Sequence, residues 1–211
     1  MGKTEVQTKK LEDIVEIQPG YQHKGQMTND LDGNLSVVQV LNLNHDLRTV
    51  ESKELWKLST DKDFTKYQIN SSDLLYLSRG TRFGAYLVPE LSEPTIPLAH
   101  FYILRLKKYA PVDISFLWWV LNERKLAKHV QSQMRGSMMP FIGRNELGQL
   151  TIPIPPKATQ ELVVEFSKLR TKERQLLTQL EAAKEKLYEA GLENKIYGDE
   201  PNNFMNELRK L

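Results

Sequence analysis

The chain has 211 residues, of which 40% are hydrophobic and 27% are charged, a composition typical of a globular protein and not of a disordered one. Its formal net charge is only +2, so the overall charge does not by itself indicate a nucleic-acid partner. It contains no cysteine, which excludes disulfides, a thiolate zinc site and a cysteine nucleophile and agrees with a reducing cytoplasm.

Segments of alternating polarity predict a strand-rich region followed by a helix. We expect strands at residues 36–43, 73–78, 83–89, 100–106 and 147–154. Pro94 and Pro97 predict an irregular connection between the third and fourth of these strands. The first strong helix is predicted over residues 114–134, where apolar residues recur at helical spacing.

A long second helix is predicted after the last strand. The strand ends in Pro155-Pro156, and Thr159 then offers an N-cap. We expect this helix to run to Ala190, with Gly191 just past its end. At about 1.5 Å per residue, such a helix would be about 45 Å long.

The same helix carries a heptad pattern. From Leu162 to Leu187 the pattern advances by alternating steps of four and three residues, and seven of its eight positions are apolar. A repeat of about 3.5 residues keeps an apolar seam facing a partner helix. The sequence therefore predicts an α+β fold, with a globular mixed sheet-and-helix domain followed by a long C-terminal coiled-coil helix. The residues expected to form the dimerisation seam are Leu162, Phe166, Leu169, Leu176, Leu180 and Leu187.

Positive charge is concentrated in one segment of the globular region. Residues 105–144 contain eight Lys or Arg against two Asp or Glu, whereas residues 26–75 contain five against eight. Such a concentration can attract phosphates, although a solvated helix face would show the same pattern.

Loop arginines are the best candidates for contacting DNA. Arg79 and Arg82 flank Gly80 on the loop after a strand, and two guanidiniums there suit phosphate contact or bidentate reading of guanine. For one arginine alone, an ion pair in the core would be the simpler interpretation, but the set of loops favours binding. The other candidates are Lys125, Lys128, Gln133, Arg135, Ser137, Arg144 and Asn145.

The motifs of catalysis are missing from the sequence. The four histidines lie far apart without metal-ligand spacing, and there is no Walker loop, nucleophile elbow or glycine-rich cofactor loop. One pattern could imitate a Mg²⁺ nuclease, namely Glu51 and Lys53 with Asp32 or Asp46 upstream. Such spacing is common by chance, so we expect no catalytic residue, no metal and no cofactor on this chain.

Several short motifs follow one another in order along the chain. They are Leu11-x-x-Ile14-x-x-Ile17-x-x-Gly20, Ser72-Asp73-Leu74-Leu75 with Arg79-Gly80, the block from Pro111 to Asn122, and Gly136-Ser137 leading through Ile142, Leu147 and Leu150 to Ile152-Pro153-Ile154-Pro155-Pro156, with Gln160 before the long helix. This series, over about residues 11–187, resembles the DNA-specificity subunits of type I restriction-modification systems. One departure is Lys157-Ala158-Thr159, where the family usually has an apolar residue followed by acidic ones.

The resemblance implies a target-recognition domain at residues 1–157, a spacer and dimerisation helix at residues 158–191, and a short tail at residues 192–211. In the family the complete subunit has no catalytic activity and carries two recognition domains joined by two antiparallel helices. This chain, with one of each, looks like a half-size form that needs a second helix, so a homodimer is expected.

The resemblance also implies a function and its partners. The subunit would direct a modification methyltransferase to a split, palindromic site on double-stranded DNA, and S-adenosylmethionine would bind to that partner. Whether a restriction subunit joins the complex is left open. The N-terminus has no signal peptide and no apolar run could span a bilayer, so we expect a cytoplasmic protein without a membrane partner.

Two other classes of function remain open at this stage. One is a small Mg²⁺-dependent nuclease built on the acidic pattern above. The other is a coiled-coil protein-interaction module whose globular part binds protein instead of DNA.

Overall fold

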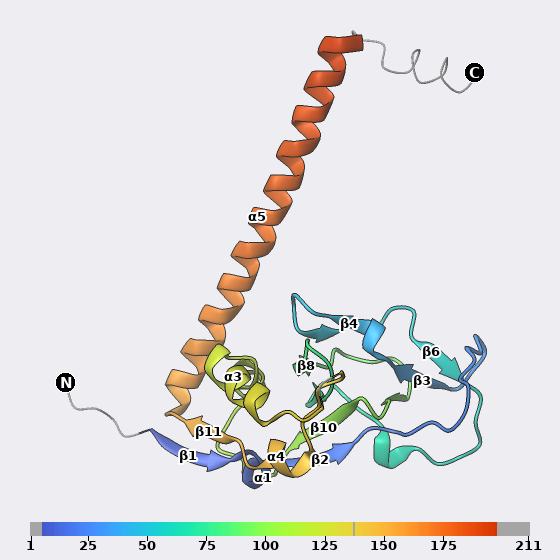
Figure 1. Ribbon diagram of the computed structural model, residues 1–211, viewed down its shortest axis with the longest axis vertical. Helices are drawn as coiled ribbons and strands as arrows, with labels where there is room; N and C mark the ends of the chain where they lie inside the picture. Colours follow the sequence, from blue (N-terminus) through green and yellow to red (C-terminus); the bar gives the residue numbers. More distant parts are fainter. Residues whose placement is uncertain (1–5, 137, 198–211) are drawn as a thin grey trace, which may run out of the picture. The chain divides into compact units, whose positions relative to one another are not determined.

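The computed structural model describes residues 6–136 and 138–197. The chain divides into two compact units, residues 1–164 and residues 165–211. The first unit contains all the strands found among the described residues and begins the last helix, whose described remainder makes up the second unit (Figure 1). No described helix is long and apolar enough to cross a membrane.

The main sheet has six strands in the order β2-β10-β7-β8-β5-β4. Strand β10 is antiparallel to both of its neighbours, so Ile103 faces Gln18 on one side and Leu75 on the other. Every residue of β7 is buried, as expected for a central strand that is covered on both faces. The strands are β2 (Val15–Pro19), β4 (Leu43–Asn44), β5 (Thr49–Val50), β7 (Asp73–Leu77), β8 (Gly84–Leu87) and β10 (Phe101–Leu106).

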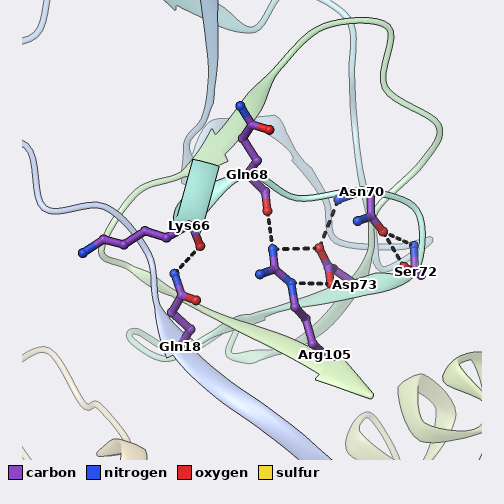
Figure 2. A network of polar contacts seen from close by, with 7 residues as sticks. All are labelled: Gln18, Lys66, Gln68, Asn70, Ser72, Asp73 and Arg105. Carbon is purple, nitrogen blue, oxygen red and sulfur yellow. Dashed lines mark hydrogen bonds and ion pairs between the residues drawn. The ribbon is translucent and has the colours of Figure 1, made fainter. Parts of the chain in front are cut away.

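A buried ion pair joins the two central strands where β7 begins (Figure 2). The side chain of Asp73 is only 2% exposed, and its carboxylate accepts a 3.0 Å hydrogen bond from Nε of Arg105. The same carboxylate accepts the Asn70 backbone N–H at 3.1 Å, and the Arg105 guanidinium also donates to the Gln68 carbonyl. A buried carboxylate is tolerated when it is paired in this way, so the network fixes the turn before β7 against β10.

Two smaller sheets complete the strand structure. In one, β3 (Leu35–Val38) lies between antiparallel β6 (Trp56–Leu58) and parallel β9 (Thr95–Pro97). In the other, β1 (Gln7–Lys10) pairs antiparallel with β11 (Thr151–Ile154). The first and last strands of the domain are therefore neighbours.

The predicted helix over residues 114–134 is wrong, because it is two helices. They are α2 (Ile114–Leu121) and α3 (Arg124–Gln133). At the break, the Asn122 side chain turns to β8, where it accepts the Ala85 N–H at 3.1 Å and donates to the Ala85 carbonyl at 2.8 Å. Glu123 has an extended backbone and caps α3, because its side-chain carboxylate accepts hydrogen bonds from two backbone N–H groups in the first turn of that helix.

Other sequence-based boundaries also need correction. The connection expected to be irregular contains β9, where Pro97 is tolerated because β9 is an edge strand. The strand expected at residues 36–43 ends at Val38 and gives way to a 3₁₀ turn over Val40–Asn42. The strand expected from residue 147 begins only at Thr151, after the short helix α4 (Arg144–Gly148). A further short helix, α1 (Leu11–Ile14), separates β1 from β2.

The last helix, α5 (Lys157–Tyr197), has 41 residues and is longer than predicted at both ends. The Thr159 N–H already donates to the Pro156 carbonyl at 2.9 Å, so Thr159 lies in the first turn and is not the cap. Gly191 lies inside the helix and does not end it. An interior glycine costs a helix only about 1 kcal/mol relative to alanine, too little to stop one of this length. The α+β class with a long C-terminal helix is confirmed.

One buried side chain docks the start of α5 onto the domain. Gln160 is 3% exposed. Its amide oxygen accepts the Asp113 N–H at 3.1 Å, and its amide nitrogen donates to the carbonyls of Pro111 at 2.9 Å and Pro155 at 3.0 Å. Val163 and Val164, on the next turn, pack against the main core. The first two turns of α5 therefore belong to the domain.

We expect Gln160→Ala to destabilise the domain by about 1–3 kcal/mol, because it removes a buried amide that bonds to three backbone groups and leaves these groups without that partner. Urea unfolding followed by tryptophan fluorescence measures the loss, since all three tryptophans lie in the first unit. Gln26→Ala, at an exposed glutamine, is the matched control and should change stability by less than about 0.5 kcal/mol. Equal stability of the two variants would contradict a docking role for the Gln160 amide.

Candidate nucleic-acid interface

Two loops that are distant in the sequence meet beyond the end of β7. Hydrogen bonds of 3.0 and 2.8 Å join residues 78–80 to residues 140–142. Two further bonds of 2.8 Å join Phe141 to Arg135. Gly80 permits this arrangement because its φ of 81° is in the left-handed region that side chains disfavour. The backbone therefore brings the loop after β7 and the loop after α3 together.

This junction gathers three of the predicted site residues, Arg79, Arg135 and Arg144, all of them exposed, into what we call the arginine cluster. Arg135 forms a 2.5 Å ion pair with Glu146. Burial raises the pKa of the Tyr102 hydroxyl, and the positive charges of Arg79 and Arg144 both oppose that rise. Both guanidiniums therefore lie near the Tyr102 hydroxyl. Within the described residues, neither of these two guanidiniums has a hydrogen-bond or ion-pair partner, so both remain free to meet phosphates.

A histidine beside the arginine cluster carries no charge near pH 7. Burial lowers the pKa of the His100 imidazole, and the positive charge of Arg79 lowers it further. A neutral imidazole can still donate one hydrogen bond and accept another. His100 can therefore contribute a polar contact at this surface without adding to its charge.

Arg82, the second arginine of the same loop, lines a different cavity. This cavity has a volume of about 600 Å³, and its walls include His45, Asp46, Arg48 and Glu51. Burial lowers the pKa of His45, and the charges of Arg82 and Arg48 lower it further. The cavity thus presents two guanidiniums, two carboxylates and an imidazole, which are groups that can read the edges of bases.

Arg48 is a residue of this cavity that the sequence did not single out. Its backbone has a φ of 53°, unusual for a residue with a side chain. Its Nη1 donates to the carbonyls of Arg82 at 3.2 Å and Phe83 at 3.1 Å, and to the Tyr86 hydroxyl at 2.9 Å. Arg48 therefore holds the backbone of the loop that carries Arg82. No local pattern signals this role, because the partners are more than thirty residues away.

The acidic pattern of the nuclease alternative is only partly assembled. Asp46 and Glu51 line the cavity just described, but Lys53 and Asp32 are not among its lining residues. In the part of the chain that the structure describes, no three His, Cys, Asp or Glu side chains are grouped so that they could hold a metal ion. The arrangement therefore gives the nuclease alternative no support.

The candidates on α3 are exposed, and one of them lines a cavity of its own. Lys125 lines a largely apolar cavity with Trp119, Leu126 and Pro153, which has no lining residue in common with the arginine cluster. Lys128 and Gln133 are exposed. Ser137 lies outside the described residues.

Asn145 shares a polar cavity of about 670 Å³ with Arg144, at the edge strand β2. Glu12, Glu16 and Lys107 also line this cavity. Its mixed charge makes it a weaker phosphate site than the arginine cluster, because the carboxylates repel an anion.

The predicted heptad seam is exposed along α5. Leu162, Leu169 and Leu176 are 65%, 61% and 54% exposed, and Leu187 is 72% exposed. Successive helical residues are rotated by about 100°, so Leu162 points away from the side on which Gln160 is buried. A run of exposed leucines of this length is typical of an interaction surface.

Comparison with known proteins gives a family for most of the chain. Residues 3–182 match the family model described as the type I restriction modification DNA specificity domain. No protein of curated function matches the chain.

Three solved structures share the fold at low sequence identity. The type I restriction-modification system S subunit from M. genitalium matches with a TM-score of 0.57 and 12% identity, over 95% of this chain and 48% of that one. The HsdS subunit from Thermoanaerobacter tengcongensis matches with a TM-score of 0.63 and 18% identity, over 94% and 46%. A chain from a study of complex assembly and conformational transition of the type I R-M system matches with a TM-score of 0.61 and 19% identity, over 95% and 46%. The present chain thus spans about half of each.

Proposed function

We propose that this chain, which belongs to the type I restriction-modification DNA-specificity family, is a half-size specificity subunit that binds DNA. It would direct a partner methyltransferase to a split, palindromic site and perform no chemistry itself. The observation that carries the proposal is the family match over residues 3–182, and the described residues form one strand-rich domain and one long helix. S-adenosylmethionine would belong to the partner, and a restriction subunit could join the same complex.

The exposed seam of α5 calls for a partner helix, and we propose that a second copy of the chain supplies it. The exposed seam of α5 would be covered by the same seam of the partner subunit, and burying a leucine contributes roughly 1.5–3 kcal/mol. The heptad positions map onto themselves when the helix is reversed about a point between Arg174 and Gln175. An antiparallel pair would therefore have four facing sets, namely Leu162 with Leu187, Phe166 with Ala183, Leu169 with Leu180, and Glu173 with Leu176.

Charges on the helix favour the antiparallel pair over a parallel one. In a parallel pair, Glu173 would face Glu173 of the partner subunit in the middle of the seam, and two carboxylates at close range repel each other. In the antiparallel pair, Glu165 at the edge of the seam would lie beside Lys186 of the partner subunit. This attraction would occur twice, because the pair is two-fold symmetric.

The same register gives a spacing for the two recognition domains. Gln160, which docks α5 onto its domain, lies about 14.5 residues from the two-fold axis. At about 1.5 Å per residue, the two docking points would be about 44 Å apart along the helices. One turn of DNA is about 34–36 Å, so the half-sites would be centred slightly more than one turn apart.

The arginine cluster is the surface that we propose for DNA contact, together with Arg82 on the same loop as Arg79. Exposed guanidiniums on hydrogen-bonded loops are suited to phosphates and to bidentate reading of guanine. The lysines of α3 would add contacts to phosphates only, since an ammonium group is a point charge without the fixed fork of arginine.

The proposed dimer predicts the form of the DNA target. Selection of binding sites from a random duplex library by the chain with its methyltransferase should yield an inverted repeat, because a two-fold dimer presents one recognition domain twice. The gap between half-sites should have one fixed length, since paired helices form a stiff spacer. A continuous asymmetric motif, or a gap that varies by several base pairs, would contradict the proposal.

Two substitutions test the DNA surface on the selected duplex. Arg79→Ala should weaken specific binding by about 1–3 kcal/mol if the guanidinium reads a guanine. Lys128→Ala should weaken binding to all sequences about equally and reduce the slope of log K against log salt by about 1. Fluorescence anisotropy at several salt concentrations measures both effects. Lys62→Ala, at an exposed lysine remote in sequence from these loops, is the control, and parental binding by both test variants would rule out this surface.

A double substitution tests the seam. Leu169→Asp with Leu176→Asp should convert the dimer to a monomer, because it places buried carboxylates in the interface. Light scattering after size exclusion gives the mass directly. Gln175→Asp with Thr178→Asp changes the same number of charges off the seam and should leave the dimer intact. A seam variant that keeps the mass of the parent would refute the helix pairing.

A further inference from the structure

The loop after α3 presents two methionines to solvent. Met138 is 99% exposed and Met139 is 61% exposed, next to a 42% exposed Phe141. Large apolar side chains of this exposure usually mark a contact surface when they occur together. The proposed function, which assigns phosphate and base contacts to arginines, leaves these residues without a role.

The base of this loop is held rigidly. Arg135 and Phe141 exchange two backbone hydrogen bonds of 2.8 Å, and the Pro140 carbonyl accepts the Gly80 N–H at 2.8 Å. Gly136 has a φ of 92°, and a Cβ at this position would meet the Met139 carbonyl oxygen at 3.0 Å. Glycine is therefore favoured at position 136, and the backbone bonds between Arg135 and Phe141 close the base of the loop that carries the methionines.

The charges around the loop indicate what covers it. Among the described residues, the guanidiniums of Arg79 and Arg144 lie near its base without a partner, whereas that of Arg135 is paired with Glu146. An apolar tip with a positively charged base complements a duplex, whose phosphates flank a stack of apolar base faces.

We propose that Met138 and Met139 form an apolar wedge that enters between two adjacent base pairs of the target and partly unstacks them. This inference rests on the proposed DNA-binding function and adds to it a means of distorting the duplex. Methionine suits the role because its unbranched thioether adapts to an irregular gap. Apolar side chains inserted at a base step are a general way in which proteins kink DNA. The arginines beside the wedge would hold the phosphates on either side of the opened step.

The test uses the full chain and the duplex recovered by selection, with 2-aminopurine replacing single adenines in turn. Unstacking raises 2-aminopurine fluorescence, so the parent should produce a rise at one step in each half-site. Met138→Ala with Met139→Ala should abolish this rise and weaken binding about tenfold, because the apolar contact with the bases is lost. Met138→Leu with Met139→Leu keeps the apolar volume and should retain most of both signals.

Leu31→Ala is the matched control, because Leu31 is 80% exposed but lies between Asp30 and Asp32, whose charge repels DNA. It should bind and unstack like the parent. If the parent binds but no position brightens, and the alanine variant binds equally well, the wedge is refuted while DNA recognition stands. If the alanine variant binds DNA normally but no longer assembles with the methyltransferase, the loop is a protein contact and the wedge is again refuted. A parent that binds no duplex would overturn the proposed function and the wedge with it.

Discussion

The buried amide of Gln160 is the contact on which the docking of the first turns of α5 depends. It is bonded to the backbone of the segment that leads into α2 and to the carbonyl of Pro155, just after β11. Because β11 pairs with β1, the same contact holds the start of the long helix to both ends of the domain. A glutamine is suited to this position, since it donates and accepts at once and carries no charge that burial would penalise.

The strands of the sheet centre could be predicted closely from sequence, and the break in the helical region could not. Residues 73–78 and 100–106 differ from β7 and β10 by one residue each, because a strand buried on both faces leaves a short apolar run between turn residues. The break within residues 114–134 could not be predicted, because it is caused by hydrogen bonds between Asn122 and Ala85, which lies on a strand distant in the sequence. At Gly191 the error was the opposite one: the glycine predicted a helix end, but the helix continues through it because the residues around it favour helix.

The residue types of the candidate interface could be found from sequence more easily than their grouping. Arg79, Arg135 and Arg144 stand out as basic residues in or near loops, but their assembly depends on residues 140–142, whose backbone bonds reach residues 78–80 as well as Arg135. Lys125 was placed in the same set because it shares their charge, yet it lines a separate cavity. Arg48 was missed because its importance lies in three long-range hydrogen bonds that leave no trace in its neighbours along the chain.

Glu173 interrupts the otherwise apolar seam of α5, and this makes target binding depend on the concentration of the protein. In the proposed dimer it would be the one charged group among the facing residues, and its desolvation would lower the association constant. At concentrations below the dimer dissociation constant, most chains would be single and able to hold only one half-site. Occupancy of a complete target would then rise with the square of the protein concentration. A twofold change in expression would change occupancy about fourfold, so the helix would make target binding sensitive to gene dosage.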